Sequence, residues 1–83
     1  MSQARINVKG TVTAITYPAY GATPNVDVTI HVGSALLILC FMSRRNIDAI
    51  DIGQRIQVRG RLTERDGVPV VYNPEYTILP EGS

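Results

Sequence analysis

Residues 26–42 read VDVTIHVGSALLILCFM. In the first half of this stretch apolar residues alternate with polar ones, which is the period of a β-strand with one buried face. Gly33-Ser34 is a turn signal, and the eight residues that follow it are all apolar. We therefore expect an antiparallel hairpin whose second strand is apolar on both faces.

Strand periodicity continues on both sides of this hairpin. Upstream, one face of a strand carries Ile6, Val8, Val12 and Ala14. Downstream, the alternation over 56–62 predicts a fourth strand, and the turn signal Asp66-Gly67 leads into a last strand over 70–79. Gly10 and Gly60 take inward positions in the first and fourth strands, where a missing side chain lets a long strand bend sharply.

A short helix is expected between the third and fourth strands, because Ser43 can cap a helical turn that ends at Gly53. Three strands, a short helix and two strands make an all-β, five-stranded OB-fold, which is a Greek-key barrel. A small SH3-like barrel is the competing topology, but it has no natural place for that helix. The 83 residues make one domain over 1–83, with its core over about 5–80.

Charge and composition exclude several classes of protein. Eight Lys and Arg against seven Asp and Glu give a net charge of +1, which excludes a histone-like tail and a polybasic membrane anchor. The longest apolar run, Ala35 to Met42, is far below the ~20 residues that span a bilayer, so we expect no membrane partner. Cys40 is the single cysteine and lies in that run, which favours a core residue in a reducing compartment, by default the cytoplasm.

The sequence contains no constellation of residues that is typical of an enzyme. His31 is the single histidine and falls on the polar face of its strand, where a surface role is more common than a catalytic one. One cysteine and one histidine do not make a zinc site. We therefore expect a non-enzymatic protein that needs no cofactor or metal.

The apolar third strand poses a question, because a small barrel buries only one face of each strand. One interpretation is that neighbouring loops or a dimer partner cover the outer face. The other is that outward side chains, Leu37, Leu39 and Phe41, form a platform on which nucleic-acid bases stack. If the pairing slips by one residue, the outward set changes to Leu36, Ile38, Cys40 and Met42.

Arginines, which supply seven of the eight cations, lie beside this strand and along the next one. Arg44 and Arg45 follow Phe41 closely. The outward face of the fourth strand and the turn beyond it carry Arg55, Arg59, Arg61 and Arg65. Arg5 and Lys9 lie beside them if the first strand pairs with the fourth. Guanidinium groups neutralise phosphates and an aromatic ring stacks on any base, so this pattern favours a groove for single-stranded nucleic acid.

Tyrosines add a second kind of candidate. Tyr20 lies in the loop predicted over 18–25, where it offers a flat face to bases. We assign Tyr72 and Tyr76 to structure, because Pro74 interrupts the strand ladder between them.

Three segments of the chain resemble known families. They read FMSRR at 41–45, IGQRIQVRGRL at 52–62 and VYNPEYTIL at 71–79. Together they are similar to short actinobacterial OB-fold proteins assigned to nucleic-acid binding, over about Val8 to Pro80, and to the wedge OB domain of RecG-type branched-DNA helicases. The third strand resembles the DNA-binding OB domains of replication protein A, which implies base stacking by Phe41. The chain has no helicase motor, so the resemblance does not imply strand separation.

The sequence thus predicts a protein that binds single-stranded nucleic acid, with DNA favoured over RNA and with little sequence preference. Its groove would run between the 18–25 loop and the turn that joins the fourth and fifth strands. We expect Phe41 and Tyr20 to stack on bases. The residues expected to hold phosphates are Lys9, Arg44, Arg45, Arg59, Arg61 and Arg65. The alternative is a protein-interaction or dimerisation module that binds a second copy or another protein through the third strand.

Overall fold

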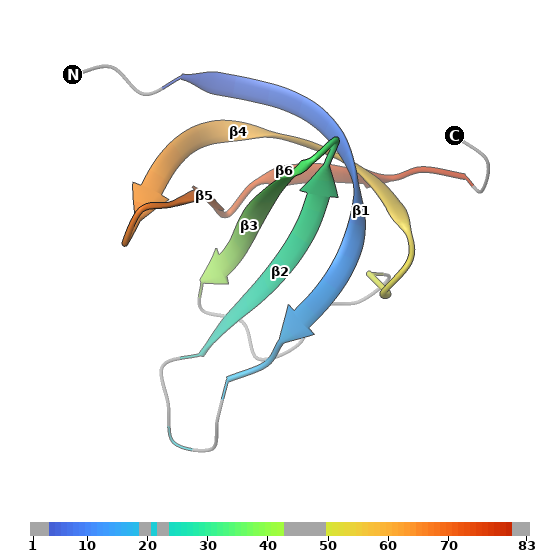
Figure 1. Cartoon of the computed structure of the whole chain (residues 1–83). Coiled ribbons are helices and arrows are strands. Elements are labelled where there is room, and N and C mark those ends of the chain that lie inside the picture. The colour runs from blue at the N-terminus through green and yellow to red at the C-terminus, as the bar shows by residue number, and fades with distance from the viewer. Residues whose placement is uncertain (1–3, 19–20, 22–23, 43–49, 81–83) are drawn as a thin grey trace.

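The computed structural model describes residues 4–18, 21, 24–42 and 50–80. Over these ranges the chain is all-β, without a helix that could span a membrane (Figure 1). The strands are β1 (Arg5–Thr16), β2 (Asn25–Val32), β3 (Ala35–Met42), β4 (Arg55–Arg65), β5 (Val68–Tyr72) and β6 (Glu75–Ile78). The short helix predicted from Ser43 onward falls largely on residues 43–49, which lie outside the described residues.

Five of these strands close a ring in the order β1–β2–β3–β5–β4 and back to β1. Neighbours in the ring are antiparallel except β3 and β5, which run parallel between the pairs Ile38–Val70 and Cys40–Tyr72. β6 pairs with β4 outside the ring. Because the ring is closed, one face of each of its strands contributes to a single core, as the alternation in the sequence predicts.

The bend in β1 depends on Gly10. β1 pairs with β4 over Arg5–Thr11 and with β2 over Thr11–Thr16, so one strand serves both neighbours (Figure 1). Gly10 is buried next to this switch, and a Cβ on it would lie 2.5 Å from the carbonyl oxygen of His31. The prediction of an inward glycine at a strand bend is therefore confirmed, and its physical reason is the close approach of the β2 backbone.

A β-bulge at Thr13 reverses the alternation in the second half of β1. The register between β1 and β2 shifts by one residue between Val12 and Ala14. Ala14 consequently lies opposite Thr29 on the polar side, and Ile15 packs against the core in its place. The prediction that Ala14 shares the inward face of Val12 is wrong, because a bulge inserts one residue and exchanges the two faces.

The last predicted strand is divided into β5 and β6 by a second irregularity. Asn73 has a left-handed φ of 49°, and Pro74 follows it without an N–H to donate. The Asn73 backbone N–H donates to the Cys40 carbonyl at 2.8 Å, and the Asn73 Oδ1 accepts from the Met42 N–H at 2.9 Å. The predicted interruption at Pro74 is confirmed, and Asn73 additionally fixes the end of β3.

The turn at Gly33-Ser34 sets the register of β2 and β3. It places Val32 opposite Ala35, and continuing the antiparallel ladder places Val26 opposite Phe41. Since Val26 faces the core and is fully buried, its partner on β3 faces the core too.

Phe41 is therefore a core residue. Its side chain is 3% exposed, and its ring meets the ring of Tyr76 edge-on with the centroids 5.5 Å apart. Leu37 and Leu39 are buried on the same inward face. The prediction that these three residues of β3 face outward is wrong, because the two-residue turn fixes the other register. The outward set is Leu36, Ile38, Cys40 and Met42.

Replacing Gly10 with alanine is expected to lower the free energy of unfolding by about 2–3 kcal/mol, because the new Cβ would overlap a backbone carbonyl held in the β1–β2 ladder. The matched change is Gly60→Ala, whose Cβ would meet the Val71 side chain at 2.6 Å and can be relieved in part by moving that side chain. Urea denaturation of both variants makes the comparison. A Gly10→Ala protein as stable as the parent would contradict this account of the bend.

Replacing Phe41 with alanine is expected to lower the free energy of unfolding by about 3–5 kcal/mol, because it removes a large ring from the core. Phe41→Leu, which keeps most of the apolar volume, should cost clearly less. The measurement is urea denaturation together with oligonucleotide binding by the folded protein. A stable Phe41→Ala protein that has lost binding would restore the stacking role.

Candidate nucleic-acid interface

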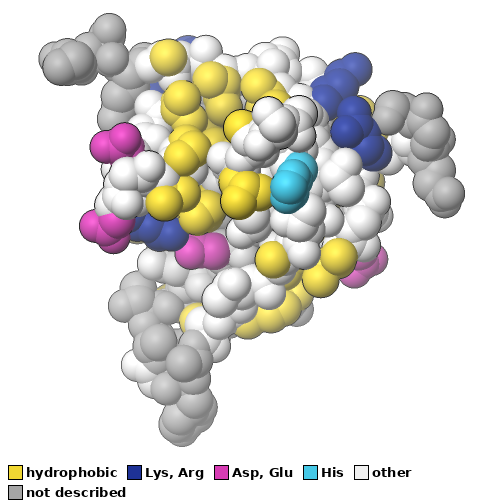
Figure 2. Space-filling model, in the orientation of Figure 1, with side chains coloured by type: hydrophobic (Ala, Val, Ile, Leu, Met, Phe, Trp, Pro, Cys, Tyr) yellow, Lys and Arg dark blue, Asp and Glu magenta, His cyan; other side chains and the backbone are white. Residues whose placement is uncertain are grey.

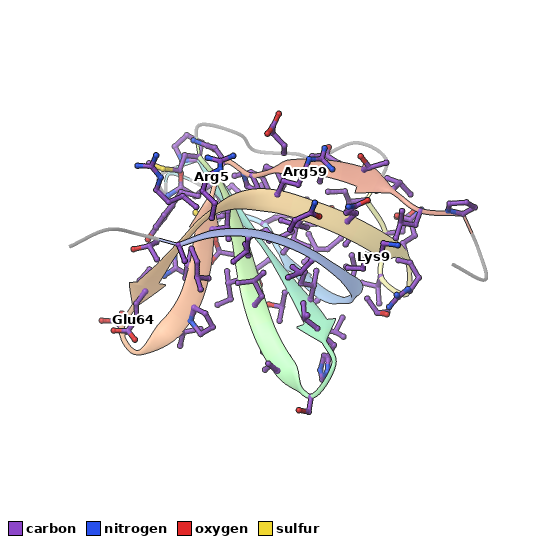
Figure 3. The ribbon with its side chains drawn as sticks, turned by 90° about the horizontal axis from the view of Figure 1, so that it is seen from above. Arg5, Lys9, Arg59 and Glu64 are labelled. Atoms are coloured by element: carbon purple, nitrogen blue, oxygen red, sulfur yellow. The ribbon has the colours of Figure 1, made fainter. Side chains whose placement is uncertain are left out.

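The outer faces of β1 and β4 form a strongly cationic surface. The two strands pair antiparallel from Arg5–Arg61 to Thr11–Arg55, and their odd-numbered residues point away from the core. Five of the eight Lys and Arg residues of the chain stand on this surface: Arg5, Lys9, Arg55, Arg59 and Arg61. We call these five side chains the basic face. Figure 3 shows Arg5, Arg59 and Lys9 spread along the two strands.

The polar residues between the cations hold the strand pair together. Gln57 Nε2 donates to Asn7 Oδ1 at 2.7 Å, across the β1–β4 ladder. Arg55 Nη1 donates to Thr11 Oγ1 at 3.4 Å, one step further along the same ladder. These contacts tie side chains to the opposite strand, so the basic face rests on a well-connected pair of strands rather than on a loop.

The register places like charges together on the basic face. Arg5 lies directly opposite Arg61, an arrangement that destabilises an antiparallel pair. Within the described residues the one ion pair shorter than 4.0 Å lies elsewhere, so Arg5, Lys9, Arg59 and Arg61 have no carboxylate at that distance. Glu75 of β6, opposite Arg59 in the ladder, is the acidic residue that the register brings nearest. A bound anion would offset the repulsion.

Arg65 differs from the cations of the basic face because it forms an ion pair with a carboxylate. Its Nη2 lies 2.9 Å from Asp27 Oδ2, and this contact links the end of β4 to β2. The hydrogen bond with Asp27 raises the pKa of Arg65 above its ordinary value. Because a carboxylate already neutralises this guanidinium, Arg65 is a weaker phosphate ligand than Arg5, Lys9, Arg59 and Arg61, which have no carboxylate partner in the part of the chain that the structure describes.

Cys40 lies beneath this ion pair. Its side chain points outward from β3, yet it is fully buried. Burial, followed by the hydrogen bond to Asp27, raises the pKa of the Cys40 thiol, and Arg65 acts on it in the opposite sense. The Arg65–Asp27 pair thus lies over the middle of the outer face of β3 and contributes to the burial of the outward Cys40 side chain. A buried, protonated thiol is not a nucleophile.

The structure brings together only part of the predicted site. Lys9, Arg59 and Arg61 share the basic face, whereas Phe41 lies in the core and Arg65 is paired on another side of the ring. The remaining predicted residues, Tyr20, Arg44 and Arg45, lie outside the described residues.

Two residues gain importance from the pairing of the strands. Arg5 completes the basic face. The sequence places Arg5 beside the other cations only if the first strand pairs with the fourth, and the structure contains that pairing. Tyr72 is 39% exposed and lies opposite Cys40 on the outer side of β5. Tyr72 points outward because its neighbour Val71 faces the core and successive residues of a strand face opposite sides. The outward direction of Tyr72 can therefore be predicted from the alternation over 70–72.

The candidate site contains no ready-made metal centre. No group of three or more His, Cys, Asp and Glu residues with metal-binding geometry occurs in the part of the chain that the structure describes.

No protein-family model and no curated protein matches the chain. The function of the chain is therefore inferred from the charge and geometry of its own residues.

Proposed function

We propose that this chain is an OB-fold protein that binds single-stranded nucleic acid, with DNA favoured over RNA and with little sequence preference. The observation that carries the proposal is the basic face, in which Arg5, Lys9, Arg59 and Arg61 have no carboxylate partner among the described residues. The protein would act by binding alone, without a cofactor. A free, buried Cys40 supports a reducing compartment such as the cytoplasm.

The order of the strands supports the OB-fold part of the proposal. A ring of five strands with a long first strand that pairs with both β2 and β4 fits a small Greek-key barrel of this class. The parallel contact of β3 with β5, between otherwise antiparallel neighbours, is the step that makes the connectivity differ from a simple meander.

The basic face suits the backbone of a nucleic acid. Its cations follow two neighbouring strands, so a chain of phosphates lying along those strands meets several of them at once. Arginine predominates, and its planar fork binds phosphate oxygens in pairs. The two amides on this face, Asn7 and Gln57, are hydrogen-bonded to each other, which favours binding to phosphates over the reading of base edges and hence little sequence preference.

Aromatic stacking contributes less to the proposal than the sequence predicts. Tyr17 and Tyr72 are the exposed tyrosines among the described residues, and neither belongs to the basic face. Binding would therefore depend mainly on phosphate contacts and would weaken steeply as salt is added.

The test is fluorescence anisotropy of a labelled oligothymidylate, titrated at several salt concentrations with duplex DNA and RNA as competitors. Arg59→Gln with Arg61→Gln is expected to lower the affinity at low salt by about tenfold or more, because two phosphate ligands are lost. The slope of log K against log salt should become shallower by about 0.7 for each lost contact.

Arg65→Gln is the control for the single changes Arg59→Gln and Arg61→Gln, because each removes one positive charge and Arg65 is already paired with Asp27. It should leave most of the affinity in place. Absence of binding by the parent protein at low salt would refute the proposal, and so would an equal loss of affinity in Arg65→Gln.

A further inference from the structure

We propose that the chain has a second docking surface, on the outer side of β3 and β5, which binds a protein segment whose apolar side chains are flanked by Lys or Arg. The surface lies on a different side of the ring from the basic face, and the inference does not depend on nucleic-acid binding.

The docking surface carries apolar side chains on both strands, on either side of the stretch that the Arg65–Asp27 pair covers. Its members are the outward-facing, exposed or half-buried side chains Leu36, Ile38, Met42, Val68 and Tyr72, which we call the apolar patch. Leu36 is 48% exposed and Val68 37% exposed. Each lies two residues before the Ile38–Val70 pair on parallel strands, so the two stand at the same end of the patch. Exposed apolar side chains grouped in this way mark interaction surfaces.

Acidic residues border the apolar patch at the β4–β5 turn. Asp66 lies in the turn itself, and Glu64 lies opposite Pro69, on the other face of the hairpin from Arg65 and Val68; both acids are exposed. Arg65 is engaged with Asp27, so it does not neutralise the two acids beside it. Figure 3 shows Glu64 at the end of β4 far from Lys9, and in Figure 2 hydrophobic side chains gather beside acidic ones at the left, where Figure 1 shows this turn.

The charge at the turn selects among possible occupants. A nucleic acid would be repelled by the exposed acids of this turn, and a second copy meeting this surface with its own would bring two such turns together. A protein segment with apolar side chains and flanking cations matches both the patch and its rim. The chain would then join a nucleic acid on one side to a protein on the other.

The experiment uses the whole chain and a short fluorescent amphipathic peptide of leucine and lysine, with a leucine–glutamate peptide of the same pattern as the comparison. The leucine–lysine peptide should bind saturably and at least about tenfold more tightly than its acidic counterpart. Leu36→Ser with Val68→Ser should weaken that binding about tenfold or more. Glu64→Gln with Asp66→Asn should abolish the preference for lysine. Asparagine is chosen because residue 66 has a left-handed φ of 53°.

The basic-face variant Arg59→Gln with Arg61→Gln is the matched control and should bind the peptide as the parent does, whether or not the parent binds an oligonucleotide. Circular dichroism and urea denaturation verify that each variant is folded. Equal affinity for the two peptides, or no binding, would overturn the proposal. Concentration-dependent self-association that the Leu36→Ser, Val68→Ser change abolishes would identify a second copy as the occupant and overturn it too. Loss of oligonucleotide binding in the same folded variant would assign the patch to nucleic acid instead.

Discussion

The ring closes because β1 divides its pairing between two neighbouring strands. Its first half pairs with β4 and its second half with β2, and the ring cannot close unless one strand does both. Gly10 permits this switch because the His31 carbonyl occupies the space that a Cβ would need. Closure in turn determines which face of each strand is buried, and so determines which charged residues remain outside.

The distribution of charge follows from that closure. Pairing β1 with β4 places Arg5 opposite Arg61, whereas the far end of β4 carries Arg65 to Asp27. A chain with a net charge of only +1 thus presents cations on one side and two exposed acids at the β4–β5 turn. The net charge is a sum over the whole molecule and contains no information on where the charges lie. A net charge near zero is therefore compatible with a locally basic surface.

Much of the fold could be predicted because it is encoded in local pattern. Alternation located the strands, and Gly33-Ser34 and Asp66-Gly67 located the turns. The inward position of Phe41 can also be predicted from the sequence, since a two-residue turn at Gly33-Ser34 places Phe41 opposite Val26. The bulge at Thr13 was not, because no residue there requires it. The Arg65–Asp27 pair joins positions 38 residues apart, so only the closed ring reveals it.

Contact between phosphates and the basic face can be observed residue by residue, by amide chemical-shift mapping by NMR during titration with a single-stranded oligonucleotide. We expect the largest changes on residues 5–9 of β1 and 55–61 of β4, and we expect raising the salt concentration to reverse them. Changes concentrated on residues 36–42 of β3 and 68–72 of β5, with β1 and β4 unaffected, would contradict binding through the basic face.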